Sequence, residues 1–161
     1  MFQSKITILL KLACSILICQ SIGIVSGLLS ANANNAWFNT VVKPSWNPPS
    51  YLFAPVWTVL YLLMGIALWL VWKLPINSLA KTKALYIFAL QLFFNFWWTI
   101  LFFTLHSPFL ALIDIFLLLF TLTITIYSFA PLSRTASWLL VPYIAWVTFA
   151  TILNYTIWSM N

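Results

Sequence analysis

The sequence predicts an all-α integral membrane protein: one domain, residues 1–161, built as a bundle of five transmembrane helices. Of the 161 residues, 64% are hydrophobic and only 5% are charged, and the mean hydropathy is +1.05. This composition is typical of a chain whose solvent is lipid. Apolar stretches of about 20 residues, the length that crosses a bilayer as a helix, divide the chain. They cover residues 6–30, 53–72, 84–105, 109–130 and 137–158.

The first apolar stretch, 6–30, allows two interpretations. Lysines before an apolar run and the small residues at 31–33 resemble a signal peptide with its cleavage site. The run is longer than the usual core of a signal peptide, however, and Gly23 and Gly27 have the spacing at which transmembrane helices approach closely. A retained and packed first helix is therefore the favoured interpretation.

The second stretch, 53–72, follows a proline-rich segment that ends the only long connection, 32–52. Prolines restrict φ and remove backbone donors, so this connection should be a stiff cap that presents Trp46, Tyr51 and Trp57. The alternative is that these aromatic residues belong to the belt at the lipid headgroups. The remaining helices are joined by short connections containing proline or polar residues, as expected of breakers. These connections lie at 73–83, 106–108 and 131–136.

The distribution of positive charge predicts the orientation. All but one of the cationic side chains fall on the side of the N-terminus, and Lys43 alone lies opposite. Those on the N-terminal side are Lys5, Lys11, Lys73, Lys81, Lys83 and Arg134. The N-terminus should therefore face the cytoplasm, with the C-terminus and the cap outside. The cations form no basic patch, so nucleic-acid binding is not expected.

Three stretches carry a helical stripe that mixes aromatic, small and amide side chains. The stripes are Trp57, Tyr61, Met64, Gly65 and Leu68; Gln91, Asn95, Trp98 and Phe102; and Tyr143, Trp146, Ala150, Leu153 and Asn154. Because lipid offers polar groups no partners, these faces should turn inward. They could line one outward-opening cavity for a large planar hydrophobic ligand. The alternative is that the stripes only pack helices together.

The residues that usually carry catalysis or bind metals are scarce. Asp114, the only carboxyl side chain, lies within the fourth stretch and could serve a structural role or meet a polar group of a ligand. His106 is the only histidine, and the two cysteines are five residues apart on one helix. No metal site and no catalytic grouping of Asp114 with His106 is therefore expected.

Several motifs resemble the TspO/translocator protein family, the tryptophan-rich sensory proteins related to the peripheral-type benzodiazepine receptor. The motifs are Trp46-Asn47-Pro48-Pro49, Ala54-Pro55-Val56-Trp57, Met64-Gly65, Asn95-Phe96-Trp97-Trp98, Ala111-Leu112-Ile113-Asp114 and the run from Pro142 to Trp158. They occur in the family's order and extend the resemblance from about Gly23 to Asn161. The resemblance implies a five-helix bundle, often dimeric, that binds porphyrins such as protoporphyrin IX and isoquinoline and benzodiazepine-type drugs.

The same resemblance implies which residues contact the ligand. They are Pro48, Trp57, Asn95, Trp98, Phe102, Trp146 and Ala150, and the stripe on the second stretch adds Tyr61. The expected role is that of a receptor or transport protein in tetrapyrrole homeostasis, with porphyrin as a ligand and no covalently bound cofactor. Light-dependent porphyrin breakdown, ascribed to some relatives, would use the indoles of Trp57 and Trp146. A structural protein that modulates a partner and binds no ligand is the third possibility.

The C-terminal segment departs from the family members that bind cholesterol. After Leu153-Asn154-Tyr155 the chain continues to Asn161 without a lysine or arginine, so the sterol motif is incomplete. This departure argues against sterol binding. Together with the asymmetry of positive charge, it favours the inner membrane of a bacterium over a mitochondrial membrane. The expected assembly is a homodimer, as the resemblance implies, with small residues such as Gly23 and Gly27 as a candidate contact.

Overall fold

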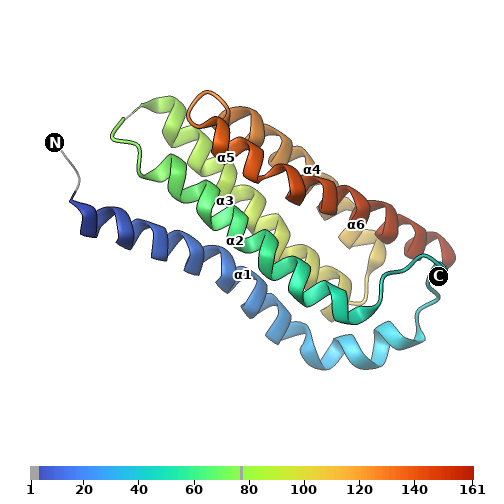
Figure 1. Cartoon of the computed structure of the whole chain (residues 1–161). Helices are drawn as coiled ribbons and strands as arrows, with labels where there is room; N and C mark the ends of the chain where they lie inside the picture. Colours follow the sequence, from blue (N-terminus) through green and yellow to red (C-terminus); the bar gives the residue numbers. More distant parts are fainter. Residues whose placement is uncertain (1–3, 77) are drawn as a thin grey trace.

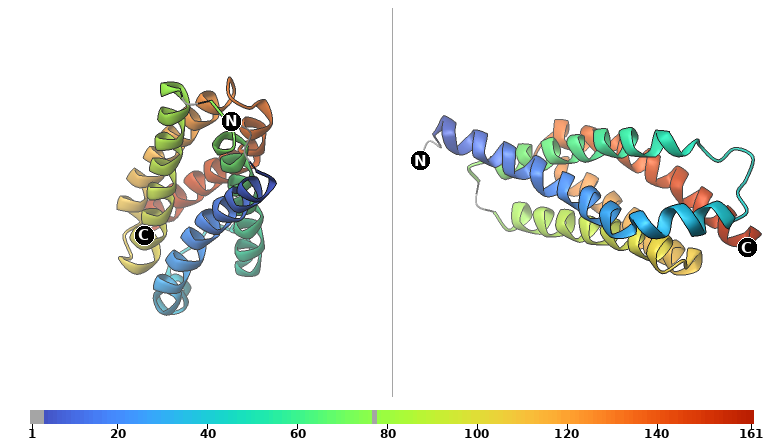
Figure 2. Two further views of the ribbon diagram at one scale, coloured as in Figure 1. Left: turned by 90° about the vertical axis from the view of Figure 1, so that its left-hand side faces the viewer. Right: turned by 90° about the horizontal axis from the view of Figure 1, so that it is seen from below.

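A computed structural model describes residues 4–76 and 78–161, and of residues 31–36 the backbone alone. Within that part of the chain, five helical segments are long and apolar enough to cross a membrane, which confirms the predicted fold class. The helices run side by side as an elongated bundle with the chain termini at opposite ends (Figures 1 and 2). They are α1 (Lys5–Thr40), α2 (Phe53–Trp72), α3 (Leu79–Thr99), α4 (Pro108–Phe129), α5 (Arg134–Leu139) and α6 (Val141–Met160).

Serine residues start four of these helices. The hydroxyls of Ser4, Ser78, Ser107 and Ser133 each accept a hydrogen bond from a backbone N–H in the first turn of α1, α3, α4 and α5. Such a cap satisfies one of the N–H groups that a helix start leaves without a partner. Pro108 follows Ser107 at the first position of α4, where its missing N–H costs nothing.

The first helix is longer than the sequence predicts. The expected connection at 32–52 is helical as far as Thr40, so the prediction of a loop from residue 32 is wrong. No proline occurs in the chain before Pro44, and polar residues alone do not break the backbone hydrogen bonds of a helix. The remaining connection, 41–49, leads through a 3₁₀ turn at Ser50–Leu52 into α2.

Two other segments end differently from the expectation. A π-helical turn, Ile100–Thr104, extends α3. The left-handed backbone of His106 (φ 51°) then closes it, and the Ser107 N–H donates to the Leu101 oxygen at 3.0 Å. The fifth span is divided at Leu140 into α5 and α6, because Pro142 can neither donate a helical hydrogen bond nor pack against the preceding turn.

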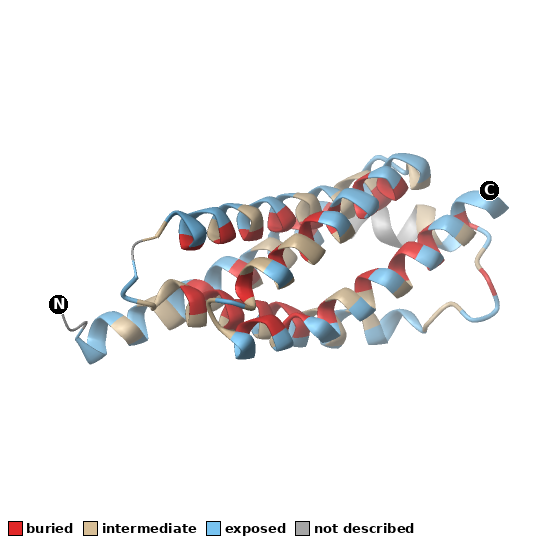
Figure 3. Cartoon of the chain, turned by 90° about the horizontal axis from the view of Figure 1, so that it is seen from above, coloured by how far each residue is buried: buried red, intermediate tan, exposed pale blue. Residues whose placement is uncertain are grey.

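The core lies where the inward faces of the helices meet, and Figure 3 shows the buried residues along those faces. The first helix packs along α2 at two glycines. A Cβ atom on Gly65 would lie 2.7 Å from the Cα of Ile16, and one on Gly23 would lie 2.3 Å from the ring of Tyr61. Gly27 contributes nothing to this contact, because a Cβ atom there would meet no described atom within 4 Å. Close packing of α1 therefore depends on Gly23 and not on Gly27.

Candidate functional site

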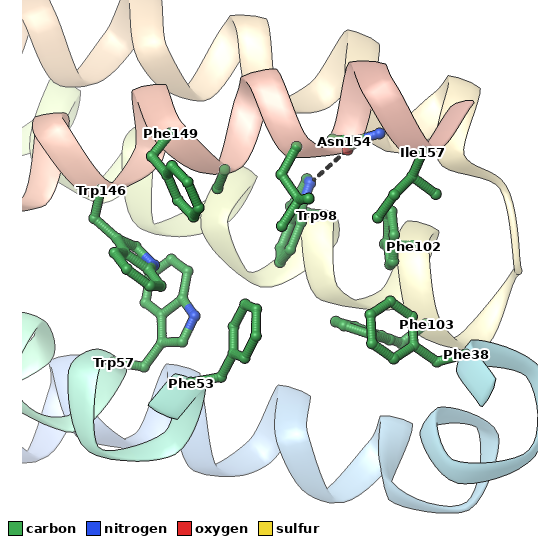
Figure 4. A pocket seen from close by; sticks show the side chains of 12 residues that line it. Phe38, Phe53, Trp57, Trp98, Phe102, Phe103, Trp146, Phe149, Asn154 and Ile157 are labelled. Atoms are coloured by element: carbon green, nitrogen blue, oxygen red, sulfur yellow. Dashed lines mark hydrogen bonds between the residues drawn. The ribbon is translucent and has the colours of Figure 1, made fainter. Parts of the chain in front are cut away.

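Aromatic side chains from five segments surround a narrow cavity at the end of the bundle that holds the C-terminus, which we call the aromatic cavity (Figure 4). It is lined by Phe38 of α1, Phe53 and Trp57 of α2, Trp98 of α3, Phe102 and Phe103 of the π-helical turn, and Trp146, Phe149, Ala150, Leu153, Asn154 and Ile157 of α6. Part of each predicted stripe reaches this cavity: Trp57 from the second stretch, Trp98 and Phe102 from the third, and Trp146, Ala150, Leu153 and Asn154 from the fifth. The first helix reaches the cavity only through its extension beyond residue 32.

The rings of the aromatic cavity fill most of it. Phe53 meets Trp146 edge to face at 6.0 Å between ring centroids, and Trp98 stacks on Phe102 at 5.5 Å. These arrangements are favourable for aromatic pairs. The volume left is about 30 Å³, enough for one or two water molecules. A larger ligand could enter only if some of the rings turned aside.

A wider cavity, the side cavity, lies between α1, α2 and α3 and has a volume of about 330 Å³. Its walls combine apolar and polar side chains. They are Gln20, Gly23, Ile24, Ser26, Gly27, Phe53, Ala54, Trp57, Thr58, Tyr61, Trp98, Thr99 and Phe103. Phe53, Trp57, Trp98 and Phe103 line both cavities, so these four side chains form the partition between them.

A chain of hydrogen bonds next to Trp57 links α2, α3 and α6. The Tyr61 hydroxyl donates to Oδ1 of Asn95, Nδ2 of Asn95 donates to the Tyr143 hydroxyl at 2.8 Å, and that hydroxyl donates to Oε1 of Gln91 at 3.2 Å. All four side chains are buried. Both tyrosine rings also contact Trp57, Tyr61 by stacking at 5.5 Å and Tyr143 edge to face at 6.2 Å. The network therefore holds the surroundings of the Trp57 indole in place.

A second polar contact holds Trp98. Its Nε1–H donates to Oδ1 of Asn154 at 3.0 Å, and Nδ2 of Asn154 donates to the backbone oxygen of Pro108 at 2.8 Å. One amide therefore joins α3, α4 and α6 at the wall of the aromatic cavity. Trp146 has no such partner: its Nε1 is buried and makes no hydrogen bond within the described part of the chain. A buried donor without an acceptor costs about 1–3 kcal/mol, which an acceptor on a ligand could recover.

The expected ligand-binding residues fall into three groups. Five of them line the aromatic cavity, and they are Trp57, Trp98, Phe102, Trp146 and Ala150. Tyr61 lines the side cavity, as Trp57 and Trp98 also do. Asn95 and Pro48 line neither cavity: Asn95 belongs to the hydrogen-bond chain, and Pro48 lies half-buried in the connection 41–49.

Asp114 also lies away from both cavities. Its side chain is buried on α4, and Oδ2 has no hydrogen-bond partner among the described residues. The structure therefore shows no contact between this carboxyl group and the space that a ligand could occupy.

Seven residues that line the aromatic cavity were not among the predicted ligand contacts. They are Phe38, Phe53, Phe103, Phe149, Leu153, Asn154 and Ile157. Phe38 lies in a segment that was expected to be a loop, so helical spacing was not applied to it. Phe53, Phe149 and Asn154 lie beside identified residues on α2 and α6, and Asn154 already belonged to an inward stripe. Spacing could have suggested these three, but it does not distinguish a cavity wall from ordinary helix packing.

The connection 41–49 is hydrogen-bonded to Asn161, the residue that follows α6. Asn161 uses its side-chain amide to bind both backbone groups of Val42, accepting from the N–H and donating to the oxygen, each at 3.0 Å. Pro44 is buried, and the Trp46 ring meets Phe149 at 5.9 Å between centroids. Because Phe149 lines the aromatic cavity, this connection packs against the cavity wall from outside.

Comparison with known proteins gives concordant results. The sequence pattern of the TspO/MBR family matches residues 15–159. The chain is 40% identical over 153 residues to the Tryptophan-rich protein TspO of Chlorobaculum tepidum, covering 95% of this chain and 97% of the relative. It is also 40% identical to the protein of that name from Archaeoglobus fulgidus, covering 95% and 98%. The human Translocator protein is 36% identical over 126 residues, which cover 78% of this chain and 75% of the human protein.

Proposed function

Because the chain belongs to the TspO/MBR family, we propose that it binds porphyrins such as protoporphyrin IX, and similar planar hydrophobic molecules, inside the bundle. The observation that carries the proposal is the meeting of three tryptophans from three helices, Trp57 of α2, Trp98 of α3 and Trp146 of α6, at one cavity. Flat aromatic walls favour a flat ligand, because stacking supplies affinity while a few polar groups fix its orientation. The proposed role is in sensing or homeostasis of tetrapyrroles.

The two cavities would be used together. Sites for molecules of drug size measure about 300–1,000 Å³, so the side cavity is at the lower end of this range and the aromatic cavity lies below it. A porphyrin that entered the side cavity would displace the partition of Phe53, Trp57, Trp98 and Phe103. It would then come to lie between the indoles of α2 and α6, where the Nε1–H of Trp146 lacks an acceptor.

The test is a titration of the purified protein with protoporphyrin IX, followed by quenching of tryptophan fluorescence. Trp57→Phe and Trp146→Phe should each weaken binding, since each removes an indole wall. Trp138→Phe is the matched control, because this side chain on α5 is 72% exposed and lines neither cavity. Saturable binding that is equally tight in all three variants would show that the ligand does not lie at these indoles.

Light-dependent breakdown of the porphyrin is the second candidate function. Trp57 and Trp146 both line the aromatic cavity, so two oxidisable indoles would face a bound ligand. The expected observation is an oxygen-dependent loss of porphyrin absorbance under light, faster with the protein than in detergent alone. Equal rates would reject the enzymatic function and leave binding unaffected.

The orientation proposed from the sequence places the N-terminus in the cytoplasm, in the inner membrane of a bacterium. In the structure, the chain ends of α1 and α6 lie at opposite ends of the bundle, which agrees with an odd number of spans (Figure 1). The aromatic cavity would then lie in the outer half of the membrane.

A further inference from the structure

We propose that Lys43 selects ligands that carry a carboxylate, by pairing with that group beside Phe38 at the wall of the aromatic cavity. The inference rests on the proposed function, and it further specifies that the preferred ligand is negatively charged. Porphyrins with propionate side chains, such as protoporphyrin IX, have that charge, whereas their methyl esters have lost it.

The position of the Lys43 ammonium group is the first support. Its Nζ lies 4.3 Å from the centroid of the Phe38 ring, a favourable distance for a cation over an aromatic face. The Phe38 ring lines the aromatic cavity and meets Phe103 edge to face at 5.5 Å. The ammonium group therefore lies against a ring that also lines the aromatic cavity, so an acidic side chain of a ligand bound there would have to extend past that ring to meet it.

The backbone around Lys43 is also fixed. Val42, the preceding residue, has both of its backbone groups bound to the side chain of Asn161 at 3.0 Å. The following residue, Pro44, is buried and has a restricted φ angle. A lysine held between two anchored residues loses less conformational freedom when it pairs with a ligand than one on a free loop would lose.

The sequence offers only one acidic side chain as a partner for this lysine. Asp114 is the only acidic side chain in the sequence, and it is buried on α4 without a hydrogen-bond partner for Oδ2 among the described residues. Lys43 is also the only lysine or arginine between Lys11 and Lys73 in the chain. Lys43 is half-buried, and a cation of this kind favours an anion from outside the protein. Salt screens the attraction between two such charges less than it screens a pair at a fully exposed surface.

The experiment compares two ligands that differ only in charge. Protoporphyrin IX and its dimethyl ester are titrated separately into the parent protein, Lys43→Met and Lys43→Arg in a nonionic detergent without phospholipid. Lys43→Met should weaken binding of the acid by about tenfold, the scale of one charge-assisted hydrogen bond, and leave binding of the ester unchanged. Lys43→Arg should retain the preference for the acid. Lys83→Met, at the opposite end of the bundle, is the control for lost charge.

The outcomes separate the two proposals. If the parent binds neither porphyrin, the proposed function fails. If it binds both, and Lys43→Met weakens both equally or neither, porphyrin binding stands and the selection by Lys43 is rejected. A third outcome is that Lys43→Met leaves porphyrin binding in detergent unchanged but weakens association of the protein with vesicles containing phosphatidylglycerol. The lysine then binds lipid phosphate, which likewise rejects the inference.

Discussion

The contrast between Gly23 and Gly27 gives a test of the packing of α1 that is independent of any ligand. A Cβ atom on Gly23 would lie 2.3 Å from Cε2 and 2.8 Å from Cδ2 of Tyr61, distances that real side chains do not show. On Gly27 the same atom would meet nothing described within 4 Å, apart from its own helix. Replacing each glycine by alanine should therefore have opposite effects on stability, although both lie on one helix four residues apart.

The expected difference in stability between the two variants depends on how firmly the Tyr61 side chain is held. Its ring is buried, stacks on Trp57, and carries a hydroxyl that donates to Asn95, so it cannot turn away without breaking these contacts. Overpacking of this kind costs about 1–3 kcal/mol. Either substitution gains up to about 1 kcal/mol from helix propensity. Gly23→Ala should accordingly be less stable than Gly27→Ala by about 1–3 kcal/mol.

The measurement is unfolding of both variants and the parent in one detergent, followed by circular dichroism during titration with a denaturing detergent. We expect Gly27→Ala to match or exceed the stability of the parent and Gly23→Ala to fall below it. Equal stability of the two variants would refute the close packing of α1 on Tyr61. As a further check, Gly27→Leu should fill part of the side cavity and weaken porphyrin binding without a loss of stability.

Three further predictions concern polar contacts. Lys81 donates to the carbonyl oxygens of Trp72, at the end of α2, and Leu74, at 3.1 and 2.6 Å. The free energy of unfolding of Lys81→Met should therefore be about 1–3 kcal/mol lower in the same assay than that of Lys83→Met, whose side chain is exposed. Asn161→Ala removes both hydrogen bonds to Val42 and should speed cleavage of the connection 41–49 by a protease, with unchanged resistance elsewhere. Tyr143→Phe breaks the buried chain of hydrogen bonds at its centre and should lower stability by about 1–3 kcal/mol, and an unchanged midpoint of unfolding would contradict the described network.

The sequence predicted the structure well where the spacing of residues along a single helix determines which of them face inward. The second apolar stretch, 53–72, has the same bounds as α2, and the inward stripes bring Trp57, Trp98 and Trp146 to one cavity. Periodicity is sufficient here because residues on one face of a helix must meet whatever that face packs against. Whether these residues bind a ligand remains a prediction.

The sequence predicted less where the contacts of a side chain depend on residues from neighbouring helices. Asn95 has the spacing of a cavity residue, but its amide lies between the hydroxyls of Tyr61 and Tyr143, which come from other helices. The extension of α1 was missed because the polar composition of residues 31–40 resembles that of a loop. Phe38 could be placed at the cavity only once that extension was known.

The length of α1 determines how far the connection 41–49 lies from the apolar span of that helix. With 36 residues and a rise of 1.5 Å per residue, this helix is about 54 Å long, whereas the hydrocarbon layer is about 30 Å thick. Its last ten residues, 31–40, follow the apolar span and add about 15 Å of helix. Phe38 lies on this extension, so a change in the tilt of α1 within the membrane would also move the ring that lines the aromatic cavity and contacts Lys43.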